Sequence, residues 1–326
     1  MFLFESRAEH RRSNHIRHHT RAERRGPCRH LVCVLAQLAC AYGCSSTQGA
    51  PPTGGASGLS DTGRAEGSAP EAVAPNAAAP EAPVATAADP CANALLCDDF
   101  DSLVVGSKPG APWSVSENNG SVLISSERAF SGANSVHCTG NSGRFAQAYF
   151  SIQGAPLFPA AGAAMYGRMM LWVRDNPQGS IHWTFVSAEG RSSTDDYTAF
   201  YRVGGQVDGR LLANYWTEGN ATDCWDHSTT VMPVGDAGGW TCLEWHYQTA
   251  TDELEFWLNG RALTDLHIVS KGEGCIAHDL ADVWEAPAAF DVLRLGWEHV
   301  ATTDQREIWI DDVAVGTTRQ GCPAPR

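Results

Sequence analysis

Four polar residues have side chains suited to an elimination reaction next to a carboxylate group: Arg168, His182, Arg202 and Tyr215. Arg168 or Arg202 could neutralise a substrate carboxylate, and His182 could remove the carbon-bound proton that this neutralisation acidifies. Tyr215 could then protonate the leaving oxygen. We expect the four side chains to lie on one concave sheet. Successive residues of a strand point to opposite faces, so alternate positions of neighbouring strands can share one face.

Each of these residue types also has a structural role that competes with catalysis. A strand arginine commonly pairs with a surface acid, a strand histidine commonly serves as hydrogen-bonded scaffold, and a tyrosine commonly fills a core or rim. The catalytic hypothesis therefore requires that the four side chains meet in one cleft.

Several other chemistries lose support because their motifs are absent from the sequence. It contains no G-x-S-x-G, H-E-x-x-H, phosphate-binding glycine loop or paired C-x-x-C, which argues against serine hydrolases, zinc proteases and nucleotide-binding proteins. The two glutamates and one aspartate of a glucanase strand are also missing. Glu253 and Glu255 alternate along a run, but with Asp252 they follow a turn, where we expect them to face solvent.

Eleven tryptophans allow a sugar-stacking surface, because an indole face packs well on the apolar face of a pyranose. Most tryptophans of a β-sandwich belong to its core. We expect the more exposed ones to be Trp216, Trp225, Trp257 and Trp284, which occur at strand ends, on polar faces or in loops.

Short runs rich in Val, Ile, Phe, Tyr and Trp must position these residues, and clusters of Gly, Asn, Asp and Pro separate the runs. Ten such runs are predicted as strands: 121–126, 145–152, 166–174, 181–188, 198–203, 211–216, 240–248, 254–258, 290–297 and 308–315. Alternation within them is typical of half-buried antiparallel strands. They predict an all-β domain over 90–326, a two-sheet antiparallel β-sandwich of the jelly-roll type without internal repeats.

Three segments resemble the framework of concanavalin A-like lectin and glucanase jelly rolls. They are Cys97–Asp101, Phe130–Gly132 and Trp309–Val313. The segments 240–245 and 256–260 resemble a strand pair of glucuronan-lyase-like sandwiches and of the core domains of cellulose-induced fungal proteins. This resemblance implies a polysaccharide-related fold.

The same resemblance implies a structural calcium ion where the first and last strands lie side by side. Its ligands would be an N-terminal acid, a loop carbonyl and an aspartate of the last strand, here Asp101, Ser131 and Asp311 or Asp312. Carboxylates and carbonyls are the hard oxygen ligands that Ca²⁺ takes. The alternative is that these acids only solvate strand ends.

Two further segments resemble jelly-roll alginate lyases. Phe200–Gly204 with Asn214-Tyr215 is similar to the strand that carries their tyrosine and basic residue, and Ser180–His182 is similar to their Gln-Ile-His. Ser180 stands in place of the glutamine. The resemblance implies a uronate lyase as one possible activity.

The N-terminal 89 residues predict export and a membrane anchor. Four arginines between positions 21 and 29 precede an apolar stretch over 31–41, which is too short to span a bilayer but is typical of a signal peptide. The string 41–46 resembles a bacterial lipobox, so we predict a signal region over 1–43 and lipidation of Cys44. An ordinary secretory signal is the alternative. Residues 44–89, rich in Ala, Pro and Gly, predict a disordered tether.

The remaining chain is acidic, with 15 basic and 34 acidic residues from position 44 onward. A net charge of −19 argues against a nucleic acid partner. Seven cysteines follow the tether, so one must lack an intramolecular partner, and Cys138 is the expected one. Predicted disulfides pair Cys91 with Cys97, Cys224 with Cys242, and Cys275 with Cys322.

Together these patterns predict a bacterial cell-envelope lipoprotein, exported to the outer membrane or cell surface, whose jelly roll binds polysaccharide. The alternatives are an active uronate lyase and a structural or adhesive envelope protein, because a fold does not fix a function.

Overall fold

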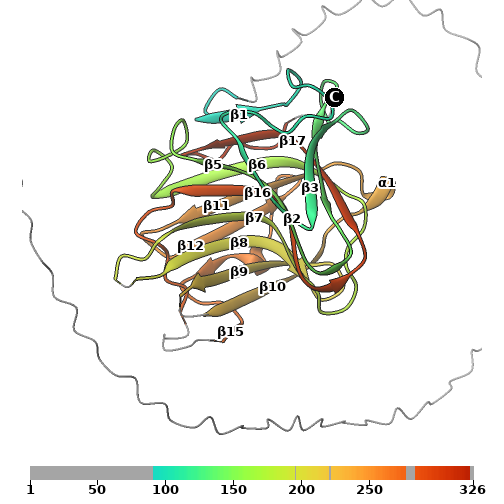
Figure 1. Cartoon of the computed structure of the whole chain (residues 1–326). Helices are drawn as coiled ribbons and strands as arrows, with labels where there is room; N and C mark the ends of the chain where they lie inside the picture. Colours follow the sequence, from blue (N-terminus) through green and yellow to red (C-terminus); the bar gives the residue numbers. More distant parts are fainter. Residues whose placement is uncertain (1–90, 195, 220–221, 277–282, 324–326) are drawn as a thin grey trace, which may run out of the picture. The chain divides into compact units, whose positions relative to one another are not determined.

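A computed structural model of the chain describes residues 91–323, apart from 195, 220–221 and 277–282 (Figure 1). The predicted signal region, Cys44 and the tether lie outside the described residues, so they stay predictions. The described residues form two antiparallel sheets, with one short helix, α1 (Gly235–Gly238), and one 3-10 turn, η1 (Thr264–Leu266). The all-β, two-sheet class is confirmed. No helix among these residues is long and apolar enough to cross a membrane.

Each sheet combines runs of consecutive strands with strands that are distant in sequence. The nine-stranded sheet runs β13 (Arg261–Ala262), β12 (Glu253–Leu258), β11 (Thr241–Gln248), β6 (Ala164–Val173), β17 (Arg306–Gly316), β4 (Ser135–Gly140) and β3 (Gly120–Ser125), with β1 (Leu96–Asp98) on β17 and β14 (Ile268–Val269) on β12. The eight-stranded sheet runs β15 (Gly274–Ile276), β10 (Asp223–Val231), β9 (Arg210–Glu218), β8 (Thr198–Gln206), β7 (His182–Arg191), β16 (Val292–Thr303), β5 (Gly143–Gln153) and β2 (Ser114–Asn118).

The core lies between the two sheets and follows from strand alternation. In β11, Leu243, Trp245 and Tyr247 are buried in it, whereas the residues between them point to the outer face. In β8, Tyr201 and Val203 are likewise in the core. All ten predicted runs overlap strands of the structure.

Several strands escape sequence-based prediction because they carry few large apolar residues. β4 has the sequence SVHCTG and β10 has the sequence DCWDHSTTV. Both are interior strands with a partner on each side. Their polar residues face outward, where burial does not select apolar side chains.

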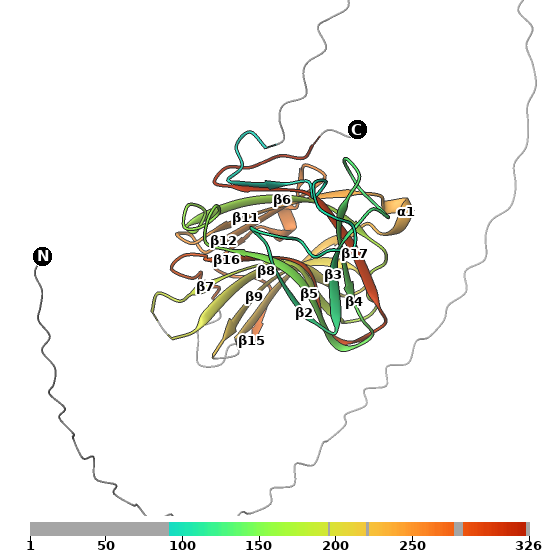
Figure 2. The same cartoon turned by 45° about the horizontal axis from the view of Figure 1, so that its top comes forward.

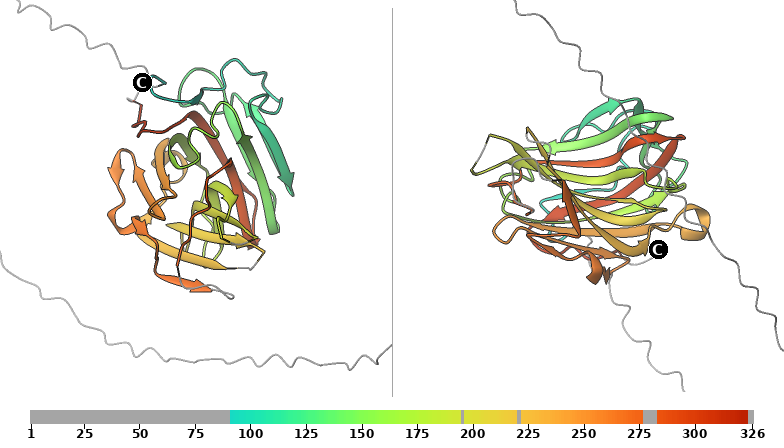
Figure 3. Two further views of the ribbon diagram at one scale, coloured as in Figure 1. Left: turned by 90° about the vertical axis from the view of Figure 1, so that its left-hand side faces the viewer. Right: turned by 90° about the horizontal axis from the view of Figure 1, so that it is seen from below.

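The first and last strands of the domain lie side by side, as the resemblance implies. β1 pairs antiparallel with β17, with Cys97 opposite Ala314. Figure 2 shows β7, β8 and β9 side by side in the eight-stranded sheet. Figure 3 (left) places the green strands near the domain's N-terminus opposite the orange segment that contains β12–β15.

Candidate functional site

A cleft of about 860 Å³ lies on the outer face of the eight-stranded sheet. Its floor comes from alternating positions of β5, β7, β8, β9, β10 and β16, and Ile276 of β15 forms part of its edge. The core-facing residues between these positions hold the floor against the second sheet. The packed strands therefore fix the backbone positions from which the lining side chains extend.

The centre of the cleft holds a polar cluster formed by β5, β8 and β16. Glu298 lies 3.7 Å from Arg202 (Oε1 to Nη1) and accepts a hydrogen bond of 3.0 Å from the amide of Gln147. Tyr149 lines the same region. Burial, followed by the nearby charge of Glu298, raises the pKa of Tyr149 well above its usual value. The phenol is therefore protonated at neutral pH, and it is a weaker acid than an ordinary tyrosine.

A second ion pair lies beside this cluster. Arg294 donates two hydrogen bonds to Glu189, of 3.1 and 2.6 Å. This bidentate pairing occupies the guanidinium of Arg294. Arg202, held by one longer contact, is the more available cation of the two.

The β9 and β10 side of the cleft is aromatic and acidic. A Cβ placed on Gly274 would lie 2.8 to 3.0 Å from three ring atoms of Trp225, so one face of this indole packs against the β15 backbone. Trp225 remains partly exposed and lines the cleft with Trp216, Asp223 and Glu218. This end therefore offers an aromatic surface flanked by carboxylates.

Arg202 joins the two ends of the cleft. Its guanidinium lies 4.8 Å from the ring centroid of Trp216 and 4.9 Å from that of Phe200. Such cation–π contacts hold the charged group over the aromatic pair without consuming its hydrogen-bond donors. The guanidinium edge can therefore still bind an anion.

Two of the four predicted catalytic residues, His182 and Arg202, line the cleft. Burial, followed by the charges of Arg202 and His227, lowers the pKa of His182 to about 3. Its buried Nε2 has no hydrogen-bond partner among the described residues. His182 is thus neutral at physiological pH, but it is a poor proton acceptor.

The other two predicted residues lie elsewhere, so the expectation of one shared sheet face is wrong. Arg168 belongs to β6 of the nine-stranded sheet, where its Nη1 donates a hydrogen bond of 3.4 Å to the carbonyl of Gly321. Tyr215 is fully buried in the core, where its ring centroid lies 6.0 Å from that of Tyr201. The reason is the two-residue period of a strand: the neighbours of Tyr215, Asn214 and Trp216, face the cleft instead.

Sequence analysis missed Tyr149, Gln147 and Glu298. A signal for them exists, because Phe145, Gln147 and Tyr149 alternate with small or core residues along β5. Glu298 lies just beyond the predicted run 290–297. Charged or amide groups inside otherwise apolar strands mark the face that is not packed on the core.

The predicted calcium ligands come together around the loop 130–134. Asp101 Oδ1 accepts hydrogen bonds from the backbone of Ala133 and Asn134, and Asp311 Oδ2 accepts two from the loop backbone. Ser131 donates its hydroxyl proton to Asp312 over 2.6 Å. The predicted ligands are therefore neighbours in space.

One atom of this cluster favours a bound cation. Oδ2 of Asp312 is buried and has no hydrogen-bond partner among the described residues. Burial raises the pKa of Asp311 to about 7, although backbone hydrogen bonds oppose the shift. The buried oxygen of Asp312 fits the preference of Ca²⁺ for hard ligands. The calcium ion itself stays a prediction.

The disulfides differ in part from the predicted pairs. Cys91 pairs with Cys97 as expected, but Cys224 pairs with Cys275 and Cys242 with Cys322. The expected pair of Cys224 and Cys242 does not form, because Cys224 faces the core directly opposite Cys275, whereas Cys242 lies on the outer face of the other sheet beside Cys322. Cys138 is the free, buried cysteine, as predicted.

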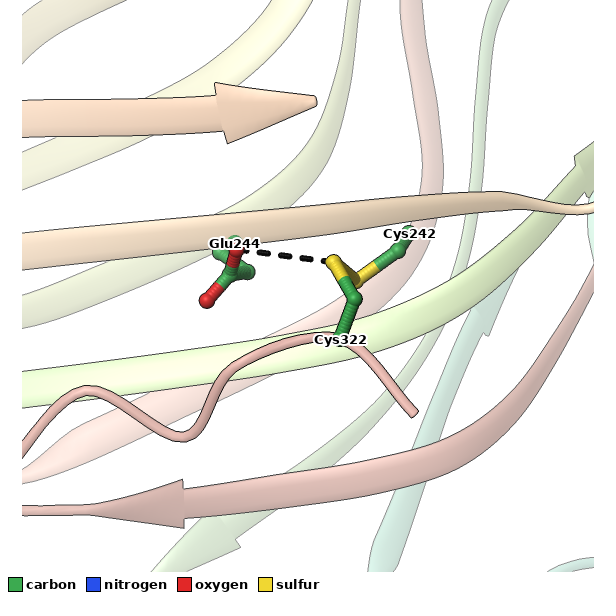
Figure 4. Close-up of side chains that lie close together, drawn as sticks. All are labelled: Cys242, Glu244 and Cys322. Carbon is green, nitrogen blue, oxygen red and sulfur yellow. Dashed lines mark hydrogen bonds between the residues drawn. A yellow bond between two sulfur atoms is a disulfide. The ribbon is translucent and has the colours of Figure 1, made fainter. Parts of the chain in front are cut away.

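The Cys242–Cys322 disulfide fastens the C-terminal segment over the outer face of the nine-stranded sheet (Figure 4). Glu244, buried beside it, accepts two hydrogen bonds from Arg319, of 3.0 and 2.7 Å, and one from the backbone of Gly321. This segment covers the face on which Arg168 lies. It therefore excludes Arg168 from any open cleft.

The tryptophans also divide between the two faces. Trp216 and Trp225 are partly exposed in the cleft, and Trp257 is partly exposed on the other sheet. Trp284 is buried, contrary to expectation, and stacks on Tyr215 at a centroid distance of 6.2 Å. The cleft thus contains two of the predicted exposed tryptophans.

The two-sheet fold and its lined cleft define a jelly-roll domain of the glucanase and lyase type. The chain belongs to the polysaccharide-lyase-like family described as Cip1-like, core domain, whose model matches residues 108–318. This family assignment confirms the resemblance to polysaccharide-related jelly rolls.

A solved structure shows the same fold. The cellulose-induced protein Cip1 is 24% identical over 70% of this chain and 99% of its own, with a TM-score of 0.50. At this identity the likeness concerns the fold alone. The binding domain of botulinum neurotoxin serotype G has a TM-score of 0.38 and 10% identity over 70% of this chain and 48% of its own. No curated protein sequence matches the chain.

Proposed function

We propose that the cleft of the eight-stranded sheet binds a polysaccharide chain. The proposal rests on the position of Trp225. One face of its indole packs on Gly274, and the residue lines the cleft. A pyranose ring can stack on such a platform, and Asp223 and Glu218 beside it can accept hydrogen bonds from sugar hydroxyls. The family of the domain supports this class of ligand.

The neighbouring sugar unit would lie over Arg202. Its guanidinium lies over Trp216 and Phe200, and its Nη1 is 3.7 Å from Oε1 of Glu298. A uronate carboxylate could take the place of Glu298 as the partner of Arg202, because guanidinium groups bind carboxylates in a planar, two-bond geometry. The cleft therefore suits a polymer that contains a uronate unit.

Three disulfides in the described residues agree with folding in an oxidising compartment. We propose that the domain works outside the cytoplasm, held by a lipid on Cys44 and the segment 44–89. A protein tethered in this way would meet polysaccharides of the cell surface or its surroundings.

Affinity electrophoresis through gels containing single polysaccharides tests the binding proposal. The panel contains neutral and uronate polymers. We expect at least one polymer to retard the protein, and the double variant Trp216→Ala/Trp225→Ala to migrate as in an empty gel. Trp257→Ala removes a tryptophan from the opposite sheet and serves as the control that keeps the retardation. Unretarded migration of the unchanged protein in every gel would refute the proposal.

A second candidate function is β-elimination at the same place, favoured by the grouping of Tyr149, Arg202 and Glu298. Arg202 would neutralise the uronate carboxylate, and Glu298, displaced from Arg202, would take the C5 proton. The C4–O bond then breaks as the C4–C5 double bond forms, and Tyr149 protonates the leaving oxygen. His182, the predicted base, is replaced in this scheme because its lowered pKa makes it a weak acceptor.

The near-ultraviolet absorbance of an unsaturated uronide tests the second candidate. A polymer that retards the protein is mixed with the unchanged protein and with Tyr149→Phe. We expect absorbance to rise only with the unchanged protein, while both proteins still bind in the gel. Binding without any rise would leave the cleft as a binding site and exclude elimination on that polymer.

A further inference from the structure

A second cluster of charged side chains lies on the outer face of the nine-stranded sheet. Glu253 and Glu255 point outward from β12, because Leu254 and Phe256 between and beside them are buried in the core. His267 follows η1 and immediately precedes β14. The cluster belongs to the sheet that does not form the cleft, so the proposed polysaccharide site does not account for it.

Strand register places two histidines on either side of one glutamate. His246 of β11 is the direct cross-strand partner of Glu255. On the other side of β12, Leu254 pairs with Ile268 and Glu253 with Val269, so His267 comes next to Glu255 in the antiparallel register. Cross-strand neighbours on one face bring their Cβ atoms to about 4.5–5.5 Å. Neighbouring backbones thus fix a row of histidine, glutamate and histidine.

Three possible metal-binding atoms, one each from Glu253, Glu255 and His267, lie close together. His267 Nε2 lies 2.8 Å from Glu253 Oε1 and 4.0 Å from Glu255 Oε1. One ligand atom from each of the three side chains lies within 4.8 Å of the others. Around a tetrahedral zinc ion with bonds of about 2.0–2.2 Å, donor atoms are roughly 3.3–3.5 Å apart. The observed separations bracket this value, so small side-chain rotations would close the site.

We propose that Glu253, Glu255 and His267 form a zinc site with a fourth position open to water or to an external ligand. An imidazole nitrogen with two carboxylates suits zinc, whereas calcium takes oxygen ligands throughout. Glu253 and Glu255 are partly exposed and His267 is exposed, so the ion can enter from solvent.

Charge at the cluster supports a divalent cation. Within the described part of the chain, the ion pairs of Glu253 and Glu255 are all to histidines. A histidine carries a positive charge only when protonated, so neither carboxylate has a permanently charged ion-pair partner among the described residues. A zinc ion supplies the missing positive charge.

His246 completes the arrangement as an outer partner of the site. Its Nδ1 lies 2.9 Å from Glu255 Oε2, the oxygen that the zinc ion would leave free. Its ring stacks on Tyr166 at a centroid distance of 3.9 Å and an angle of 6°. Histidine and carboxylate pairs of this kind orient metal ligands. His246 is therefore a positioning residue for Glu255.

Equilibrium dialysis of the full chain against zinc chloride tests the site, with thermal unfolding as a second readout. We expect the unchanged chain to hold one zinc equivalent more than either His267→Ala or Glu253→Gln/Glu255→Gln. Zinc bound by histidines outside the described residues is common to all variants and cancels in this difference. We also expect zinc to raise the unfolding midpoint of the unchanged chain and to leave that of the variants unaltered.

Two further variants sharpen the test. His227→Ala removes a histidine that contacts a single carboxylate, Glu273, at the same 2.8 Å distance on the other sheet, and it should keep the extra zinc equivalent. His246→Gln should keep the site but weaken its affinity about 10- to 100-fold. Equal zinc uptake by the unchanged chain and His267→Ala, or an unfolding midpoint that zinc does not change, would overturn the proposal.

Discussion

Replacing Trp225 by alanine tests the stacking platform most sharply, because the structure allows its contribution to be worked out. One indole face over a pyranose ring covers roughly 60–80 Å² of apolar surface, less than half of what a fully buried aromatic side chain contributes. At about 25 cal/mol per Å² this is about 1.5–2 kcal/mol, or about 10- to 30-fold in the dissociation constant. Trp225→Ala should therefore weaken binding by that factor.

Gly274 provides a second, subtler variant of the same platform. A methyl group there would meet three ring atoms of Trp225 at 2.8 to 3.0 Å, so Gly274→Ala must lift or turn the indole without removing it. We expect weaker binding than in the unchanged protein despite an intact tryptophan. Because Gly274→Ala keeps the whole indole, its weaker binding would come from the changed orientation of the ring and not from lost apolar surface.

Isothermal titration with an oligosaccharide of the retained polymer measures both changes. Trp257→Ala is the matched control, because Trp257 is also partly exposed but lies on the opposite sheet, 4.3 Å from the guanidinium of Arg319. Dissociation constants of Trp225→Ala and Trp257→Ala that both equal the value of the unchanged protein would refute the stacking argument.

Three other predictions concern the framework around the cleft. If calcium binds at Asp312, chelation with EGTA should lower the thermal midpoint by about 5–10 °C in the unchanged protein and not in Asp312→Ala, and equal midpoints with and without EGTA would contradict the site. Glu244→Gln, which weakens the buried contacts to Arg319, should cost about 1–3 kcal/mol in urea unfolding, whereas an unchanged midpoint would show that these contacts add no stability. The pKa of His182 falls from 6.5 in the unfolded chain to about 3 in the fold, so its contribution to stability is present above pH 6.5 and is lost as pH falls toward 3. His182→Gln should flatten that acid slope in urea titrations, and parallel slopes would contradict the lowered pKa.

The fold could be predicted from sequence because a strand buried on one face reveals itself by alternation. The run 240–248 shows this, with Leu243 and Trp245 on the core side. Strands with few apolar residues, such as β4 and β10, escape the same reasoning. Their place depends on partners distant in sequence, and local patterns carry no information about those partners.

The candidate site could be predicted only in part, for a related reason. Arg202 and His182 are in the cleft, but alternation does not tell which of two aromatic-rich faces is the core. In β9 the correct choice moves the aromatic cleft residue from Tyr215 to Trp216. Arg168 lies on the other sheet because strand order, which sequence does not reveal, places β6 between β11 and β17.

The disulfides show the same limit. Cys224 and Cys275 are direct cross-strand partners of β10 and β15, and this pairing depends on a register between strands some fifty residues apart. The odd number of cysteines in the domain, by contrast, requires no structure to notice, and Cys138 is indeed the one left free.

A crystal structure of the protein with an oligosaccharide from the retained polymer tests the central claim most directly, because it locates the ligand. We predict sugar density in the cleft of the eight-stranded sheet, with one ring stacked on Trp225 and the next unit within hydrogen-bond distance of Arg202. Ligand bound only on the nine-stranded sheet, or an empty cleft at saturating oligosaccharide, would contradict the account.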